Sequence, residues 1–145
     1  MTTHSTASTA ASPVHHRPPP SPRLLRRALQ LDAVVTGFNG AAYLAAAPVL
    51  GGVLGIEVMP LRAAGTFLLA YAAVVWVVGS RPTISRAAAR AVVAVNAVWA
   101  LDSVAVAATG WGTPTTLGTV WILLQAGVVG GFALLQWLGL RAGTR

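Results

Sequence analysis

The chain has 145 residues, of which 55% are hydrophobic and only 9% are charged, and its mean hydropathy is +0.69. Soluble domains carry charge at about a quarter of their positions, so this composition excludes an ordinary soluble domain and indicates a membrane protein. The net charge of +7 comes from Arg residues that lie between and beside apolar runs, which argues against nucleic-acid binding. The chain has no Cys, which excludes disulfides and thiolate sites.

The N-terminal part of the chain is polar and basic. Residues 1–22 are mostly Ser, Thr, Ala, Pro and His without apolar periodicity, and they predict a disordered tail. The Arg-rich segment 23–31 predicts a short amphipathic helix on the membrane surface, before the first crossing. The basic residues expected to face anionic lipid headgroups are Arg23, Arg26, Arg27, Arg86 and Arg90.

Four apolar runs follow in the region 32–140. They cover residues 33–54, 61–79, 91–109 and 117–138 and contain 22, 19, 19 and 22 residues. A bilayer core of about 30 Å needs about 20 helical residues, so each run is long enough to cross once. Since backbone polar groups in hydrocarbon must be satisfied internally, the runs are expected to be helices. The predicted fold class is therefore all-α, a polytopic membrane protein with four transmembrane helices in one bundle and a basic end at 141–145.

The distribution of Arg residues predicts the orientation. Nine of the ten lie in the N-terminal segment, the second connection or the C-terminal end, and only Arg62 lies on the opposite side. By the positive-inside rule, both termini are expected in the cytoplasm, with the chain in the cytoplasmic (inner) membrane. Within the first run, Pro48 cannot donate a backbone hydrogen bond to Leu44, so a kink is expected there.

The two halves of the chain share short sequence similarities. AVVTGFN at 33–39 resembles AVVAVN at 91–96, and residues 65–75 loosely match 118–129. Two helix pairs related as parallel repeats would give this pattern. A composition rich in Ala, Val and Gly also gives such matches by chance, and both interpretations stay open.

Polar residues within the first run form one stripe. Asp32, Thr36, Asn39 and Tyr43 are spaced by four, three and four residues, so they share a helix face. We expect this stripe to hydrogen-bond to other helices, with Asn39 meeting Asn96 of the third run. The alternative is a polar half-channel, which is less favoured because these side chains are poor proton carriers.

Asp102 lies in the third run, about 10 Å from its outer end at 1.5 Å per residue. An unpaired charge there costs about 2.5 to 3.5 kcal/mol, so a partner or a protonated form is expected. Gln125 and Arg62 are the candidate partners by depth. Asp102 is then a buried residue that fastens two helices, or, in the alternative, the carrier of a proton or cation in a transporter.

Two small-residue motifs predict close helix packing. Gly127 and Gly131 form GxxxG in the fourth run, and Gly51 and Gly55 repeat it at the outer end of the first. Packing within the bundle is the first interpretation, and a contact between two chains is the second.

Catalytic motifs are absent from the sequence. It has no HExxH, no Gly-rich phosphate loop, no Ser with a His base and no close pair of carboxylates. The adjacent His15 and His16 lack further ligands, so a solvated pair is expected rather than a metal site. We therefore expect a chain that is not an enzyme and that binds neither cofactor nor metal.

Several segments carry a family resemblance: AVVTGFNGAAYLAAA, VVGSRP, AVVAVNAVWALDS and GWGTPTTLGTVWILLQAGVVGGFALLQ. They resemble a group of small four-helix integral membrane proteins of high-GC bacteria and, more loosely, the DoxX-like group. The resemblance covers nearly everything after Arg23 and implies a compact four-helix membrane fold without catalytic residues. The expected function is that of a non-enzymatic component acting by association, with itself or with a membrane-protein partner. The alternative is a small oligomeric transporter that moves protons or a small solute past Asp102.

Overall fold

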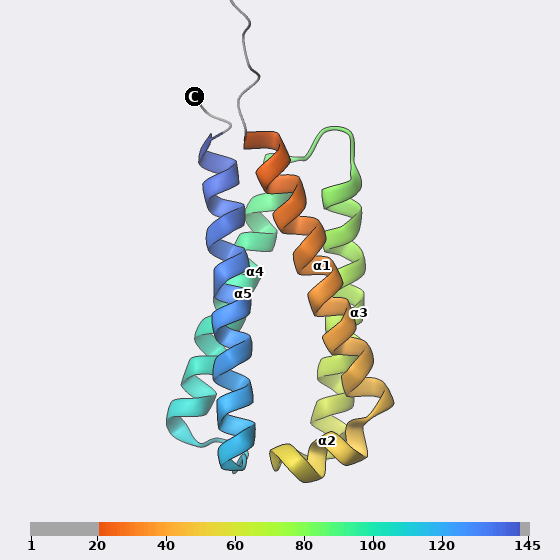
Figure 1. Cartoon of the computed structure of the whole chain (residues 1–145), viewed down its shortest axis with the longest axis vertical. Coiled ribbons are helices and arrows are strands. Elements are labelled where there is room, and N and C mark those ends of the chain that lie inside the picture. Colours follow the sequence, from red (N-terminus) through yellow and green to blue (C-terminus); the bar gives the residue numbers. More distant parts are fainter. Residues whose placement is uncertain (1–20, 143–145) are drawn as a thin grey trace, which may run out of the picture.

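A computed structural model describes residues 21–142, which form five α-helices. They are α1 (Ser21–Ala45), α2 (Ala47–Leu54), α3 (Val58–Ser80), α4 (Arg86–Thr109) and α5 (Thr116–Ala142). The long helices run side by side and the short α2 lies across one end (Figure 1). No strand occurs in residues 21–142, as the all-α prediction requires. The disordered tail predicted for residues 1–22 lies, except for its last two residues, outside the described part, as do residues 143–145.

Three helices, α3, α4 and α5, are long and apolar enough to cross a membrane. The bent pair of α1 and α2 becomes a fourth candidate when the two are taken as one span. Apolar helices of this number and length indicate a membrane-embedded, multi-pass protein.

The start of α1 differs from the prediction. Segment 23–31 is not a separate surface helix, because α1 continues through it from Ser21 to Ala45. Its apolar side, with Leu25, Ala28 and Leu29, is buried against the other helices. Burial of this side makes the segment part of the bundle.

Pro48 marks a sharp break in the chain. Helix α1 ends at Ala45, α2 begins at Ala47 with the proline in its first turn, and the two axes differ by 95°. The predicted kink is confirmed, but the predicted helix 33–54 is two helices. Pro48 fits the first turn of α2 because the missing N–H has no partner there in any helix.

Gly51 and Gly55 shape the turn after α2. Gly55 ends the helix in the left-handed region with φ of 72°, which a residue with a side chain rarely adopts. A Cβ on Gly51 would lie 2.7 Å from the carbonyl oxygen of Ile56. These glycines therefore serve a tight turn, rather than a GxxxG contact between two long helices as predicted.

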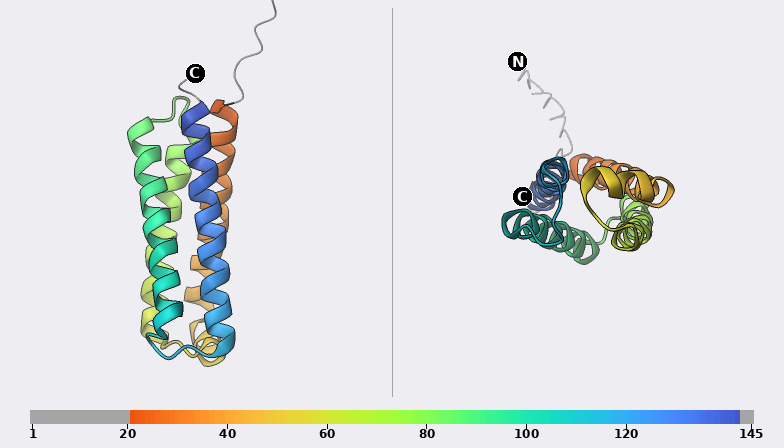
Figure 2. Two further views of the ribbon diagram at one scale, coloured as in Figure 1. Left: turned by 90° about the vertical axis from the view of Figure 1, so that its left-hand side faces the viewer. Right: turned by 90° about the horizontal axis from the view of Figure 1, so that it is seen from below.

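The long helices form two close pairs, α1 with α3 and α4 with α5 (Figure 2). In the first pair the backbones meet at Gly40 and Gly65, where a Cβ on either residue would lie 2.9 Å from the other's carbonyl oxygen. Helices α3 and α4, which are consecutive in sequence, touch very little.

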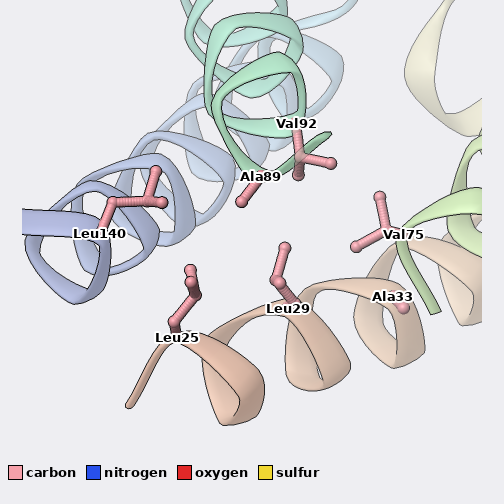
Figure 3. Packing of buried hydrophobic residues seen from close by; sticks show 7 residues of the cluster. All are labelled: Leu25, Leu29, Ala33, Val75, Ala89, Val92 and Leu140. Carbon is pink, nitrogen blue, oxygen red and sulfur yellow. The ribbon is translucent and has the colours of Figure 1, made fainter. Parts of the chain in front are cut away.

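The main apolar core lies at the end of the bundle where α1 begins and α5 ends, called here the termini end. Its buried side chains from α1, α3, α4 and α5 point toward one another in Figure 3. They are Leu25, Leu29, Ala33, Val75, Ala89, Val92 and Leu140. A smaller cluster of Tyr43, Ala47, Leu61 and Leu68 lies toward the opposite end, called the α2 end.

Two Arg residues fasten the termini end. Arg26 donates to the carbonyl oxygens of Gly79 at 2.7 Å and Pro82 at 3.0 Å, and Arg86 donates to that of Leu140 at 3.2 Å. Gly79 and Leu140 lie in the last turns of α3 and α5, where carbonyls lack helical partners, so the guanidinium groups satisfy these carbonyls. Three further Arg residues expected at the lipid headgroups are exposed: Arg23, Arg27 and Arg90.

Candidate functional site

A buried group of five polar side chains joins all four long helices. This polar cluster consists of Asp32 and Thr36 from α1, Tyr71 from α3, Asn96 from α4 and Gln136 from α5. Asp32 and Gln136 have no exposed surface, and Asn96 is 2% exposed.

The carboxylate of Asp32 is the acceptor at the centre of the polar cluster. Asn96 Nδ2 and Gln136 Nε2 donate to its Oδ2 at 2.6 and 2.7 Å, and the Thr36 hydroxyl donates to its Oδ1 at 3.0 Å. The Tyr71 hydroxyl lies 3.0 Å from Asn96 Oδ1, as a donor to it. Every hydrogen bond of the carboxylate is thus one that it accepts, as an acceptor-only group requires.

This arrangement holds the four long helices together through side-chain hydrogen bonds. Besides Asp32, the only ionisable side chain of the polar cluster is that of Tyr71, whose hydroxyl reaches Asp32 through Asn96. The prediction that the α1 stripe bonds to other helices is confirmed for Asp32. The predicted pair of Asn39 with Asn96 is wrong, because Asn39 lies seven residues, about 10 Å, further along α1 than Asp32.

A second polar contact lies nearer the α2 end. The Tyr43 hydroxyl accepts hydrogen bonds from Trp121 Nε1 at 2.8 Å and from Gln125 Nε2. This contact joins α1 to α5. It also gives Gln125 a partner on α1 in place of the predicted one, Asp102.

Asp102 lies on an exposed face of α4, so the expected interior position is wrong. It makes no hydrogen bond or ion pair with any residue from 21 to 142, including the candidate partner Arg62. The reason is helical rotation. Six residues after the inward-facing Asn96, Asp102 points about 120° away around the axis.

The GxxxG motif of α5 also faces outward. A Cβ on Gly127 or Gly131 would meet nothing within 4 Å, whereas Gly130 faces Ala100 of α4. The interpretation that Gly127 and Gly131 pack the bundle is therefore wrong for this chain. The close contacts in the bundle are made by other glycines, such as Gly40, Gly65 and Gly139.

A cavity of about 280 Å³ lies inside the bundle, with residues of all five helices in its lining. It reaches from Thr36 and Asn96, in the polar cluster, to Tyr43 and Trp121 near the α2 end. Asn39, which has no partner among the described residues, lines it as well.

Tyr71 and Gln136 were not among the predicted site residues. Gln136 lies on a polar stripe of the last run with Gln125, and that stripe was the available signal. Tyr71 is a single polar group in an apolar run, where its hydroxyl gives no periodic signal.

Residues 21–142 hold no group of three or more His, Cys, Asp or Glu side chains that could bind a metal ion. Comparison of the chain with family models, with curated proteins and with solved structures gives no match.

Proposed function

We propose that this chain is a cytoplasmic-membrane protein with four spanning helices that acts without catalysis, by association with a second copy of itself. The observation that carries the proposal is Asp102, a carboxylate exposed among apolar side chains within a candidate span. Its neighbour one turn away, Val98, is 66% exposed. A carboxylate left in hydrocarbon costs about 2.5 to 3.5 kcal/mol, so a partner that covers it is favoured.

A second copy carries a suitable partner in Arg62. Arg62 is exposed near the start of α3, about 6 Å from that helix end, and Asp102 is about 10 Å from the end of α4. Both residues lie toward the α2 end, and the Arg side chain is long enough to bridge the difference in depth. A symmetric dimer would form the ion pair twice. The open side of α5 at Gly127 and Gly131 is a further surface that another helix can approach closely.

Association is measured by energy transfer between donor- and acceptor-labelled copies in liposomes. Because the chain has no Cys, Arg145→Cys gives a single labelling site. Asp102→Leu and Arg62→Leu are each expected to weaken association about tenfold, or about 1.4 kcal/mol. The matched control is Glu57→Leu, which removes an exposed carboxylate just outside α3 and should change nothing.

The charge swap Asp102→Arg with Arg62→Asp is expected to restore association, because the ion pair is rebuilt with its charges exchanged. Equal energy transfer in all variants would contradict the proposal, as would a monomeric wild type. If the wild type is monomeric and carries protons or a solute across the membrane, and if Asp102→Asn abolishes this flux, the chain is instead a transporter.

Both termini are expected in the cytoplasm. The first residues of α1 and the last of α5 lie at the same end of the molecule (Figure 1), together with exposed Arg23, Arg27 and Arg90. Basic residues favour the cytoplasmic side. Two reporters are fused after Arg145, one that is active only in the cytoplasm and one that is active only outside the cell. Only the cytoplasmic reporter should be active. Activity confined to a reporter that works outside the cell would overturn the orientation.

A further inference from the structure

The lining of the cavity has one aromatic wall. Phe67 and Tyr71 of α3 and Trp99 of α4 have nearly parallel rings, with the Phe67 centroid 6.1 Å from that of Tyr71 and 5.6 Å from that of Trp99. The planes in each pair differ by 5°. Parallel rings favour a flat ligand, because a planar ring stacks against them with an offset.

The same lining holds an amide without a partner. The side chain of Asn39 makes no hydrogen bond with any described residue, although it can donate two and accept two. Gln125 donates to Tyr43, and its side-chain oxygen accepts no bond from residues 21–142. Polar groups held in an apolar surrounding are costly when unpaired, so these amides favour a ligand with a hydroxyl or carbonyl group.

The charge and size of the cavity further restrict the class of compounds that it can bind. Its lining contains no acidic or basic side chain, which disfavours a charged ligand. A cavity of about 150 Å³ is known to bind benzene, so one of about 280 Å³ can hold a compound with one or two rings.

The opening faces the apolar outer surface. Phe38 of α1 and Leu124 of α5 line the cavity and are 78% and 56% exposed, so they form its rim. In a bilayer this rim contacts acyl chains. A ligand would therefore enter sideways, from the membrane.

We propose that this cavity binds an uncharged, planar ring compound dissolved in the membrane, whose hydroxyl or carbonyl group hydrogen-bonds to Asn39. The ring lies against Phe67 and Trp99, and the amide holds the polar substituent. The site requires neither Asp102 nor self-association, so its ligand binding can be tested independently of the proposed dimer.

The probe is 4-bromophenol, a planar ring that carries one hydroxyl group and one bromine atom. The bromine quenches Trp fluorescence. Trp99 and Trp121 line the cavity, whereas Trp76, Trp111 and Trp137 do not. A chain in which those three are replaced by Phe reports on the cavity alone. In lipid nanodiscs we expect saturable quenching by 4-bromophenol. Binding of 4-bromotoluene, which has a methyl in place of the hydroxyl, should be about fivefold to tenfold weaker.

Asn39→Leu is expected to abolish the preference for 4-bromophenol over 4-bromotoluene. Val128→Phe, which fills the cavity and keeps the amide, should weaken both probes and is informative even where Asn39→Leu fails to fold. The matched control keeps Trp76, Trp111 and Trp137 and replaces the two cavity residues by Phe. Its quenching should rise linearly with probe in the bilayer.

Linear quenching of the same slope in both Trp sets would overturn the proposal, since the cavity would then be filled by acyl chains. Saturable binding with no preference for the phenol would also overturn it, because the amide would have no role.

Discussion

Replacing Asn96 by Leu is expected to lower the free energy of unfolding by about 2 to 4 kcal/mol. Asn96 donates to Asp32 and accepts from Tyr71, and both partners are at least partly buried. Loss of its amide leaves a fully buried carboxylate with one donor fewer and a Tyr hydroxyl without its side-chain acceptor. The measurement is unfolding by SDS titration in mixed micelles, followed by circular dichroism.

Asn39→Leu is the matched control for Asn96→Leu. It is the same change on an amide with no hydrogen-bond partner among residues 21–142, so it should leave the free energy of unfolding unchanged or raise it. The double variant Asp32→Leu with Asn96→Leu should be more stable than the sum of its single effects implies, because the two residues share one network. Equal losses at positions 39 and 96 would refute the role assigned to the polar cluster.

Gly40→Ala is expected to destabilise the protein by about 1 to 3 kcal/mol, because the bundle has no room for the added methyl group. The new Cβ would lie 2.9 Å from the carbonyl oxygen of Gly65 and 3.0 Å from Leu68 Cβ. It would also lie 3.0 Å from the backbone nitrogen of Leu69, so two of the three close contacts are with backbone, which cannot move aside as the end of a flexible side chain does. The α1 and α3 axes must therefore separate. The same SDS titration measures the loss.

The control is Gly127→Ala, where a Cβ would meet nothing within 4 Å. There the better helix propensity of Ala should leave stability unchanged or raise it by up to about 1 kcal/mol. A loss at Gly127 as large as that at Gly40 would show that the outward face of α5 is also covered in the folded chain.

The two polar contacts explain why the bundle holds a cavity between them. The polar cluster joins α1, α3, α4 and α5, and the Tyr43 contact joins α1 to α5 nearer the α2 end. Asn96 belongs to the first contact, Tyr43 to the second, and both line the cavity. The two polar contacts hold the helices at two depths of the bundle. Between these depths the backbones can stay apart, since hydrogen bonds between long side chains need no close backbone approach.

The amino-acid sequence determined the elements and their environment. Apolar runs of about 20 residues, the Pro and Gly residues between them and the scarcity of charge predict helices that cross a membrane. Helices α3, α4 and α5 begin and end close to the predicted positions, whereas the first predicted helix is two helices and begins earlier, at Ser21. These features are local, because a run must satisfy its own backbone in hydrocarbon. The break at Pro48 was predictable because it too depends on a local feature, the missing backbone N–H of proline.

The tertiary structure alone decided which polar and small residues meet. Periodicity places Asp32, Thr36 and Asn39 on one face of α1, but the rotation and depth of the partner helices select Asp32, and not Asn39, for Asn96. The same rotations turn Asp102 and the Gly127 motif outward and bring Gly40 against Gly65. In a chain this rich in Ala, Val and Gly, many faces are equally apolar, so sequence pattern cannot rank them. Close packing and complete hydrogen bonding of buried groups make the choice.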